Sequence, residues 1–243
     1  MAALGFDFVE WAVASNIGTT DQARFDELQT LTRSLPVTSE VWNILLPGDI
    51  KVVGPEADTS KLRNYLDAAL PKVRALGGEL IVFGSGRSRT VPENFDRTIA
   101  ETQFREAIGI IADVAGANDL TIVLEPLRTG ETNLINTVAE GLAVVEEMAH
   151  PNFELLADLY HMLDNGENLA DVVPAARHLR HVHIATKPRL VPLEGEDVVV
   201  LGQFLTELKR AGYDERMSFE CKSDDPDELR RGLEILRETW AAA

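Results

Sequence analysis

Four side chains that can bind a metal ion or transfer a proton stand at the ends of short apolar runs in the second half of the sequence. The runs cover residues 121–125, 153–158, 179–183 and 217–220. Segments of helical length separate them, and apolar strands that alternate with helices are typical of a parallel sheet buried on both faces. If such a sheet curls into a barrel, the carboxyl ends of its strands meet at one end. The side chains expected to converge there are Glu125, Asp158, His183 and Glu220.

Three carboxylates and one imidazole form a hard, oxygen-rich set of ligands. Such a set suits Mn²⁺, Mg²⁺ or Co²⁺ better than a thiolate-bound structural zinc. A single carboxylate at a strand end is more often a helix cap or the partner of an arginine, but four ligands at successive strand ends are harder to explain in that way. Cys221 follows Glu220 directly and therefore points to the opposite face of the strand. We predict one bound divalent ion, with Mn²⁺ preferred, and no cysteine ligand.

Two further histidines accompany these residues. His161 follows Asp158 by three residues at the turn after a strand, so both side chains can face one site. His181 and His183 are two residues apart and lie on the same face of their strand. His183 is nearer the mouth of the barrel, and His181 is expected one layer deeper.

The run GSGRSR, residues 84–89, follows another predicted strand. A dinucleotide-binding fingerprint would need a third glycine where Arg89 stands, and no Gly-Lys-Ser/Thr closes a phosphate loop. A tight turn is the simpler interpretation. It leaves Arg89 or Arg87 free to face the mouth and hold an anion or a hydroxyl group.

Composition and net charge limit the classes of molecule that the protein is expected to bind. The chain has 243 residues, 45% of them hydrophobic, and no linker marks a boundary, so residues 1–243 are expected to form a single domain. A formal net charge of -17 argues against nucleic acid and anionic membranes as partners. One cysteine cannot form an internal disulfide, no apolar run reaches the ~18 residues of a membrane span, and the start lacks a basic leader. We therefore expect a soluble cytoplasmic protein.

Strands and helices are expected to alternate along the whole chain. Residues 6–11 form the first predicted strand, with no helix or strand before it. The other predicted strands are residues 37–46, 79–84 and the four runs above, and the helices are residues 21–34, 62–76, 94–117, 137–150, 198–211 and 227–240. This gives an α/β chain with about seven of the eight strand–helix units of a TIM-like (β/α) barrel.

Short motifs surround these residues in a fixed order. They are LEPL with ETNLINT (124–127 and 131–137), DLYHM (158–162), HVHIA with Arg189 six residues after its second histidine (181–185), and SFE (218–220). Together they resemble the motifs of the xylose-isomerase-like family of sugar epimerases and isomerases. The family includes ketose 3-epimerases, hydroxypyruvate isomerases and inosose-converting enzymes. The resemblance extends from GFDFVEW near the start to the last helix.

The resemblance implies a role for each matching residue. The four metal ligands of the family match Glu125, Asp158, His183 and Glu220. Its residues that hold the hydroxyl groups and the carbonyl of the substrate match Glu131, His161 and Arg189. In the ketose epimerases of the family the two ligand glutamates also act as the acid/base pair, on opposite faces of the sugar.

Two departures from the family pattern bear on the expected structure and substrate. GFDFVEW resembles the second strand of the family, so the first strand and most of its helix are expected to be missing. Because this would leave strand edges and apolar interior open, we expect either that the two flanking strands approach each other in a tighter barrel of about seven strands or that a partner chain covers the gap. We favour the second, a homo-oligomer. In addition, Arg128, Thr129 and Gly130 stand where the family often has an asparagine and an arginine–aromatic pair, a difference that concerns which sugar is bound.

We predict a divalent-metal-dependent epimerase or isomerase of a keto sugar or related polyol. A carboxylate removes the proton next to the carbonyl, and the metal stabilises the resulting enediolate. Return of the proton from the other face inverts the centre, and return to the neighbouring carbon isomerises the sugar. Glu125 and Glu220 are the acid/base candidates.

Three alternatives stay open at this point. One is a lyase, including a C-glycoside-cleaving enzyme that acts on 3-keto sugars with the same metal site. Another is a barrel without turnover that serves as a binding or interaction subunit. A DNA-repair nuclease of the same barrel type would need a basic strip, which the net charge of -17 opposes.

Overall fold

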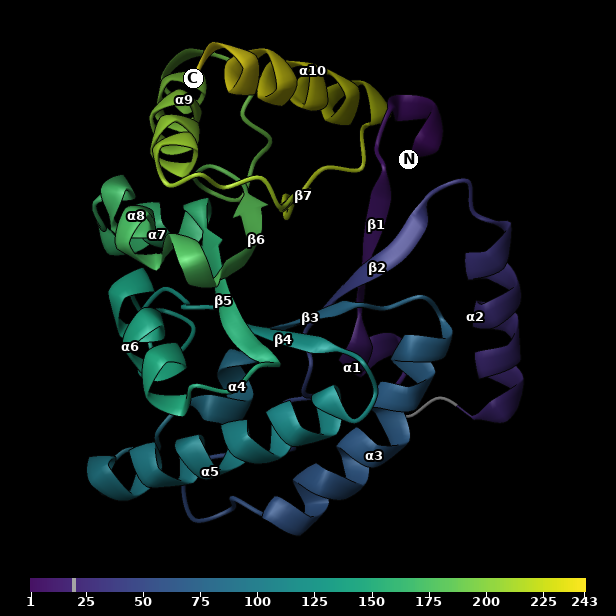
Figure 1. Cartoon of the computed structure of the whole chain (residues 1–243), viewed down its shortest axis with the longest axis vertical. Coiled ribbons are helices and arrows are strands. Elements are labelled where there is room, and N and C mark those ends of the chain that lie inside the picture. Colours follow the sequence, from purple (N-terminus) through teal and green to yellow (C-terminus); the bar gives the residue numbers. More distant parts are fainter. Residues whose placement is uncertain (19–20) are drawn as a thin grey trace.

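The computed structural model describes residues 1–18 and 21–243, and its centre is a curved sheet of seven parallel strands (Figure 1). Each strand pairs with the strand that follows it in the sequence. The strands are β1 (Phe8–Ala12), β2 (Thr38–Asn43), β3 (Leu80–Phe83), β4 (Thr121–Leu124), β5 (Phe153–Asp158), β6 (Leu179–Ile184) and β7 (Arg216–Phe219). The predicted TIM-like barrel with about seven strand–helix units is confirmed.

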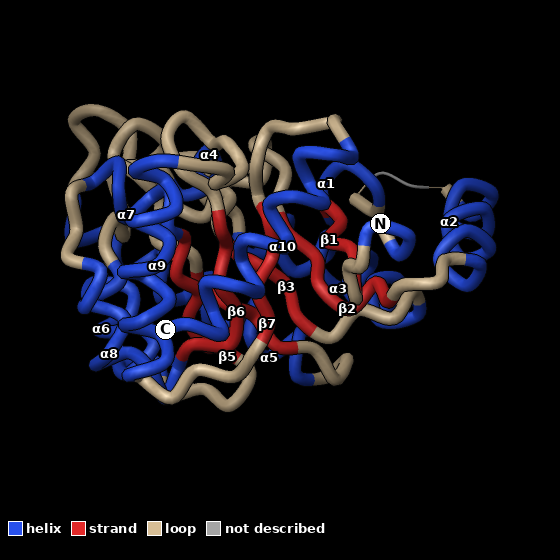
Figure 2. The backbone as a smooth tube through the Cα atoms, turned by 90° about the horizontal axis from the view of Figure 1, so that it is seen from above, coloured by secondary structure: helices blue, strands red, loops and turns tan. Residues whose placement is uncertain are grey.

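Helices follow the strands along the chain and cover the outside of the sheet (Figure 2). The longer ones are α2 (Gln22–Ser34), α3 (Thr59–Ala75), α5 (Arg97–Gly116), α6 (Val138–Met148), α9 (Gly195–Arg210) and α10 (Pro226–Ala242). At several helix starts a side-chain oxygen accepts a hydrogen bond from a backbone N–H group of the first turn. These capping residues are Asp21, Asp58, Asp96 and Thr137. Of the helices described, none is long and apolar enough to cross a membrane.

Several short elements were not predicted. A 3₁₀ turn, Ala2–Leu4, precedes β1, so the expectation that no helix comes before the first strand is wrong. Residues 86–89 form the short helix α4 (Gly86–Arg89). The other short helices are α1 (Val13–Asn16), α7 (Leu159–Asn165) and α8 (Val172–Ala175), with 3₁₀ turns at Leu169–Asp171 and Ala176–His178. None of these runs is long enough to show a helical period in the sequence.

The barrel interior is polar at the carboxyl ends of the strands and mainly apolar in the layer beneath them. Alternate strand residues point inward, and a buried cluster of inward-facing side chains forms an apolar floor made of Val41, Leu80, Val82, Val123 and Leu156. Two members of this floor lie two residues before Glu125 and Asp158 on their strands. This apolar floor therefore lies directly below the carboxylates of Glu125 and Asp158, and His181 pairs with Leu156 at the same level.

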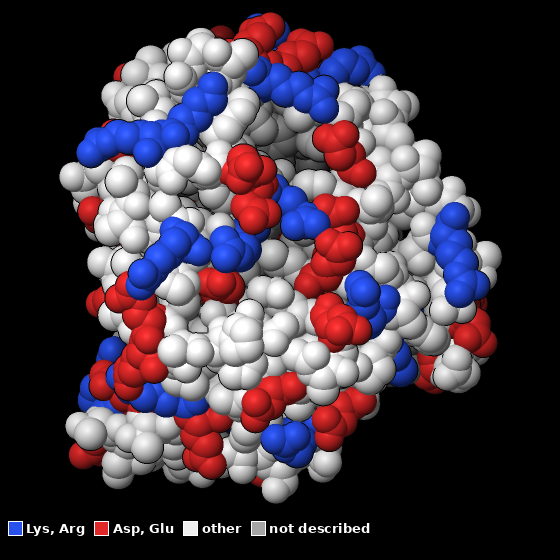
Figure 3. Space-filling model, viewed as in Figure 1, with Lys and Arg blue, Asp and Glu red and all other residues white. Residues whose placement is uncertain are grey.

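The barrel has a seam between β1 and β7, which are not paired with each other among the described residues. A groove of about 350 Å³ lies there, and its lining is mainly apolar, with Phe8, Met217, Leu229 and Leu233 among the side chains. This face is hollowed between α10 and the N-terminal segment (Figure 3). The ring of Phe6 contacts that of Phe219 across the seam, with ring centroids 6.1 Å apart. Side chains, and not a strand ladder, therefore close this part of the barrel.

Candidate metal centre

Three carboxylates lie together at the carboxyl end of the barrel. Glu125 and Glu220 directly follow β4 and β7, and Asp158 is the last residue of β5. Glu125 and Asp158 are 5% and 2% exposed. One ligand atom from each of these three residues and one from His161 all lie within 4.8 Å of one another.

The imidazole of His183 completes the predicted set of ligands from the next strand, β6. Its Nδ1 atom lies 3.2 Å from Oε1 of Glu125, 3.6 Å from Oε2 of Glu220 and 3.7 Å from Oδ2 of Asp158. The ring is fully buried. The structure thus brings all four sequence-predicted metal ligands to one place.

The chemistry of this donor set fits a divalent cation. Oδ1 of Asp158 accepts hydrogen bonds from the backbone nitrogens of Tyr160 and His161 at 2.6 and 3.2 Å, so it caps α7. Oδ2 is buried and has no hydrogen-bond partner in the described part of the chain. An acceptor left in that state, beside two more carboxylates, is costly unless a cation shares the site.

The loop after β3 shapes the space around Glu125. A Cβ atom on Gly84 would lie 2.2 Å from Oε2 of Glu125, so only glycine leaves room for this carboxylate. Arg89 is fully buried behind it. The guanidinium group donates from Nε, Nη1 and Nη2 to the carbonyl oxygens of Gly84, Leu134 and Glu125 at 2.7, 3.0 and 2.5 Å. Arg89 therefore ties two loops together behind the site, and we assign it no contact with substrate, in contrast to the role expected from the sequence.

His161, Arg189 and Glu131 form the rim beside the carboxylates. Nη1 of Arg189 donates to Oε2 of Glu220, and Nη2 lies 2.9 Å from Nε2 of His161 and 3.7 Å from Oε1 of Glu131. The guanidinium group also lies over the ring of Tyr160, with its carbon 4.7 Å from the ring centroid. The three residues predicted to hold substrate thus adjoin the metal ligands.

Both ring nitrogens of His161 lie beside N–H donors. Nδ1 of His161 lies 3.2 Å from the backbone nitrogen of Arg128, and Nε2 lies 2.9 Å from Nη2 of Arg189. A neutral imidazole carries a proton on one of these nitrogens, so it can accept from only one of the two donors at a time. His161 is therefore tied to the rim residues Arg128 and Arg189, and His183 provides the imidazole whose Nδ1 faces all three carboxylates.

Burial and neighbouring charges shift the pKa values of Glu220 and His183. Burial, with the charges of Glu125 and Asp158 and against that of His183, raises the pKa of Glu220 to about 8. Burial disfavours the charged form of His183, but the negative charges of Glu10 and Glu220 outweigh it and raise the pKa of this histidine well above its usual value. Protons therefore occupy both groups near neutral pH in the metal-free protein, and a bound cation would displace them.

Sequence reasoning missed one carboxylate, Glu10 on β1. Its two oxygens lie 3.0 Å from Nε2 of His183 and 3.1 Å from Nε2 of His181. His181 lies one layer below the mouth, as expected from its spacing to His183. The only signal for Glu10 in the sequence is a carboxylate at an inward-facing position between Phe8 and Ala12.

Comparison with known proteins decides the family. The model of the Xylose isomerase-like TIM barrel family matches residues 1–239. The chain belongs to this family. The membership predicted from the motifs is therefore confirmed, and the carboxylate–imidazole cluster lies at the carboxyl end of a xylose isomerase-like barrel.

Curated relatives of this barrel include named sugar epimerases. A ketose 3-epimerase of Arthrobacter globiformis is 35% identical over 141 residues, which are 56% of this chain and 48% of that protein. An L-ribulose 3-epimerase of Mesorhizobium japonicum is 30% identical over 212 residues, 82% of this chain and 68% of that protein. The matched region spans about half the length of the first curated relatives, at 48% and 47%.

Solved structures share the fold. A D-allulose 3-epimerase from Methylomonas sp., in complex with D-allulose, has a TM-score of 0.81 and 26% identity, and the match covers 98% of this chain and 88% of that one. The structure of an L-ribulose 3-epimerase has a TM-score of 0.83 at 20% identity, with 99% and 86% coverage, and supports the fold alone.

Proposed function

We propose that this chain is a divalent-metal-dependent epimerase or isomerase of a keto sugar or a related polyol. The observation that carries the proposal is the convergence of three carboxylates and Nδ1 of His183 at the strand ends. The names of the curated relatives, ketose 3-epimerase and L-ribulose 3-epimerase, support the same reaction class. The net charge of -17 favours a small-molecule substrate over nucleic acid.

The residues that would hold the ion are Glu125, Asp158, His183 and Glu220. When bound, a divalent ion supplies a Lewis acid that stabilises negative charge developing on a carbonyl oxygen. The excess of oxygen donors favours Mn²⁺, with Mg²⁺ and Co²⁺ as alternatives.

Glu125 and Glu220 are the proposed acid/base pair. They extend from different strands, β4 and β7, and we propose that they meet opposite faces of the bound sugar, as in the ketose epimerases that the sequence motifs resemble. One carboxylate removes the proton from the carbon next to the carbonyl, and the other returns a proton to the opposite face.

His161, Arg189 and Glu131 are proposed to orient the substrate. The guanidinium group of Arg189 donates to substrate oxygens, the imidazole of His161 donates or accepts according to its tautomer, and Glu131 can accept from a hydroxyl group. Fixing the sugar in this way holds its acidic carbon against the carboxylates and lowers the entropic cost of the proton transfer.

A second class of substrate has support from one relative. A 3-dehydro-D-guloside 4-epimerase of Escherichia coli is 26% identical over 177 residues, 69% of this chain and 67% of that protein. Glycosides oxidised at C3 carry the same acidic proton beside a ketone. With a leaving group next to the carbanion, the same carboxylates would support elimination, which is the lyase alternative.

The experiment is a screen of free ketoses, inososes and 3-keto glycosides in D₂O with Mn²⁺-loaded protein. We expect deuterium to enter the carbon next to the carbonyl of one class of substrate. Protein stripped with a chelator, and protein stripped and then refilled with Mn²⁺, serve as matched controls. Fully metallated protein that exchanges no proton in any class would contradict catalysis and leave the alternative of a binding subunit.

We also propose a homo-oligomer in which a second copy covers the seam. The support is the largely apolar groove between β1 and β7, two strands whose outer edges have no paired strand in the described part of the chain. Light scattering at low protein concentration tests this, and a compact monomer that unfolds cooperatively would contradict it. The cytoplasmic location and the single-domain organisation stay predictions.

A further inference from the structure

We propose that Glu10 is a positioning residue that selects which nitrogen of His183 faces the metal site. Its carboxylate keeps a proton on Nε2 of His183, so that Nδ1 is the atom with a free lone pair. This inference rests on the proposed function, because it concerns the affinity of the ion that the function requires.

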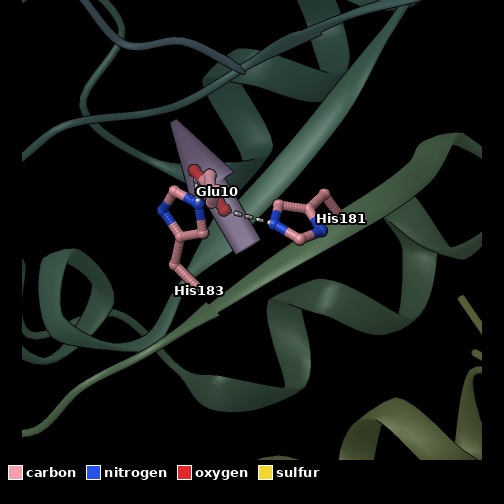
Figure 4. Close-up of side chains that lie close together, drawn as sticks. All are labelled: Glu10, His181 and His183. Carbon is pink, nitrogen blue, oxygen red and sulfur yellow. Dashed lines mark hydrogen bonds and ion pairs between the residues drawn. The ribbon is translucent and has the colours of Figure 1, made fainter. Parts of the chain in front are cut away.

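The geometry is a carboxylate clamped between two imidazole rings (Figure 4). Oε1 of Glu10 lies 3.0 Å from Nε2 of His183, and Oε2 lies 3.1 Å from Nε2 of His181. Both rings are fully buried, and the side chain of Glu10 is 10% exposed. Glu10 belongs to β1 and both histidines to β6, so the contact crosses the barrel interior and spans 171 and 173 residues of sequence.

The chemistry of the groups fixes the direction of these hydrogen bonds. An ionised carboxylate only accepts, and a neutral imidazole carries one proton on one of its two nitrogens. Nε2 of each ring therefore donates to Glu10. In the metal-loaded protein the ring of His183 is neutral, so the Nε2–H group that donates to Glu10 leaves Nδ1 unprotonated. Nδ1 is the atom within 3.7 Å of Glu125, Asp158 and Glu220.

The carboxylate also strengthens the ligand. A metal-bound histidine whose other N–H donates to a carboxylate is more basic and is held in one orientation. His181 and Ser218 keep Glu10 in place: Nε2 of His181 donates to Glu10, and Oγ of Ser218 lies 3.0 Å from the same nitrogen and can share its proton. Without Glu10, the tautomer with hydrogen on Nδ1 would compete and direct a proton at the site.

A rival arrangement uses the same residues as ligands. Glu10, His181 and His183 each offer one atom within 4.8 Å of the others, so an ion could lie among them. His183 would then bind through Nε2, and Glu10 would be a ligand and not a hydrogen-bond acceptor. The two arrangements differ in which nitrogen of His183 carries the proton.

The first test is Mn²⁺ affinity of Glu10→Gln, measured by titration of metal-free protein with the spectroscopic signal of free Mn²⁺. The amide oxygen can accept from only one of the two Nε2–H groups, so affinity should fall by about 10–100-fold. Glu40→Gln on β2 is the matched control, because Glu40 pairs with Arg216 and not with His183. Its affinity should equal that of the wild type. Unchanged affinity in Glu10→Gln, with only a lower thermal midpoint, would make Glu10 a structural residue and overturn the proposal.

The second test needs no variant and holds even if Glu10→Gln fails to fold. The ¹⁵N chemical shifts of the histidine rings in Mg²⁺-loaded wild-type protein report which nitrogens carry protons. We expect a proton on Nε2 of His183 and none on Nδ1. A proton on Nδ1, or metal coordination through Nε2, would overturn the assignment while leaving the proposed activity intact. Wild-type protein that binds no divalent ion would overturn the proposed function, and this inference with it.

Discussion

The two sides of the His183 ring differ in how completely their polar groups are paired. On the Nδ1 side, Glu125, Asp158 and Glu220 crowd together, and Oδ2 of Asp158 has no hydrogen-bond partner among the described atoms. On the Nε2 side, each carboxylate oxygen of Glu10 accepts a hydrogen bond from an imidazole N–H group. The first side is built to receive a cation and the second to hold the ring. One histidine thus separates the reactive part of the site from its support.

The largest effect is expected from removing the Nδ1 side. The double variant Asp158→Ala, His183→Ala should lose the bound ion, because half of the ligands are gone. Mn²⁺ stoichiometry by elemental analysis measures this. The control Glu154→Ala, His178→Ala removes another carboxylate–imidazole pair, 2.7 Å apart and away from the mouth, and should keep its metal. Unchanged stoichiometry in the first variant would show that the ion is bound elsewhere.

Replacing one carboxylate of the proposed acid/base pair should act on turnover. Glu125→Gln or Glu220→Gln keeps the shape of the side chain, and we expect kcat to fall by more than about a hundredfold, since a general acid or base contributes ~10²–10⁴ in rate. Metal content must be measured on the same samples, because both residues are also ligands. A variant that keeps full metal occupancy and full activity would exclude that residue as the base.

The Nδ1 side could be predicted from the sequence because each ligand carries a local signal. An apolar run stops at a polar residue, and motifs such as LEPL, DLYHM and SFE frame it. Glu10 carries no such signal, since its partners lie 171 and 173 residues away and only the curvature of the sheet brings β1 opposite β6. Arg89 was expected at the mouth, but nothing in GSGRSR shows that its guanidinium group turns back to three backbone carbonyls. Contacts between side chains that are far apart in the sequence could therefore not be predicted from local sequence patterns.

A smaller effect is expected at the rim. His161→Ala or Arg189→Ala should raise KM by about tenfold with a lesser change in kcat, because a lost hydrogen bond of this kind costs roughly 1.5 kcal/mol and acts on bound substrate and transition state alike. Arg177→Ala removes an exposed arginine that pairs with Glu146 and is the control. Steady-state kinetics in saturating Mn²⁺ gives both constants. A variant that loses kcat with KM unchanged would place that residue in the proton-transfer step.

The smallest expected effect is the pH dependence of stability. Glu220 and Glu10, which lie on opposite sides of the His183 ring, should contribute to it with opposite signs. The pKa of Glu220 is raised to about 8, so its contribution to stability is present below the ordinary carboxyl range and is lost as pH rises toward 8. For Glu10, burial acts to raise the pKa, but the charge of His183 and the hydrogen bonds from both histidines lower it well below the usual value. Its contribution is therefore present at neutral pH and is lost in acid.

Thermal unfolding of metal-free protein separates these two contributions. Between pH 6 and pH 9, roughly a unit or more to each side of the shifted pKa, the midpoint should fall, and Glu220→Gln should reduce the fall. The acid side is measured in the Glu220→Gln protein, which lacks the opposing rise. Its midpoint should fall from about pH 5 to about pH 3, at and below the ordinary carboxyl range, and adding Glu10→Gln should reduce that fall. If the midpoint of the variants depends on pH as it does in the wild type, the proposed electrostatic difference between the two sides of the His183 ring is wrong.

The most direct test of the account is the position of the ion in crystals grown with Mn²⁺. An anomalous difference map collected at the manganese edge should show one peak among Glu125, Asp158, Glu220 and Nδ1 of His183, with Glu10 outside the coordination sphere. A peak among Glu10, His181 and Nε2 of His183, or no peak inside the barrel, would contradict the proposed metal centre.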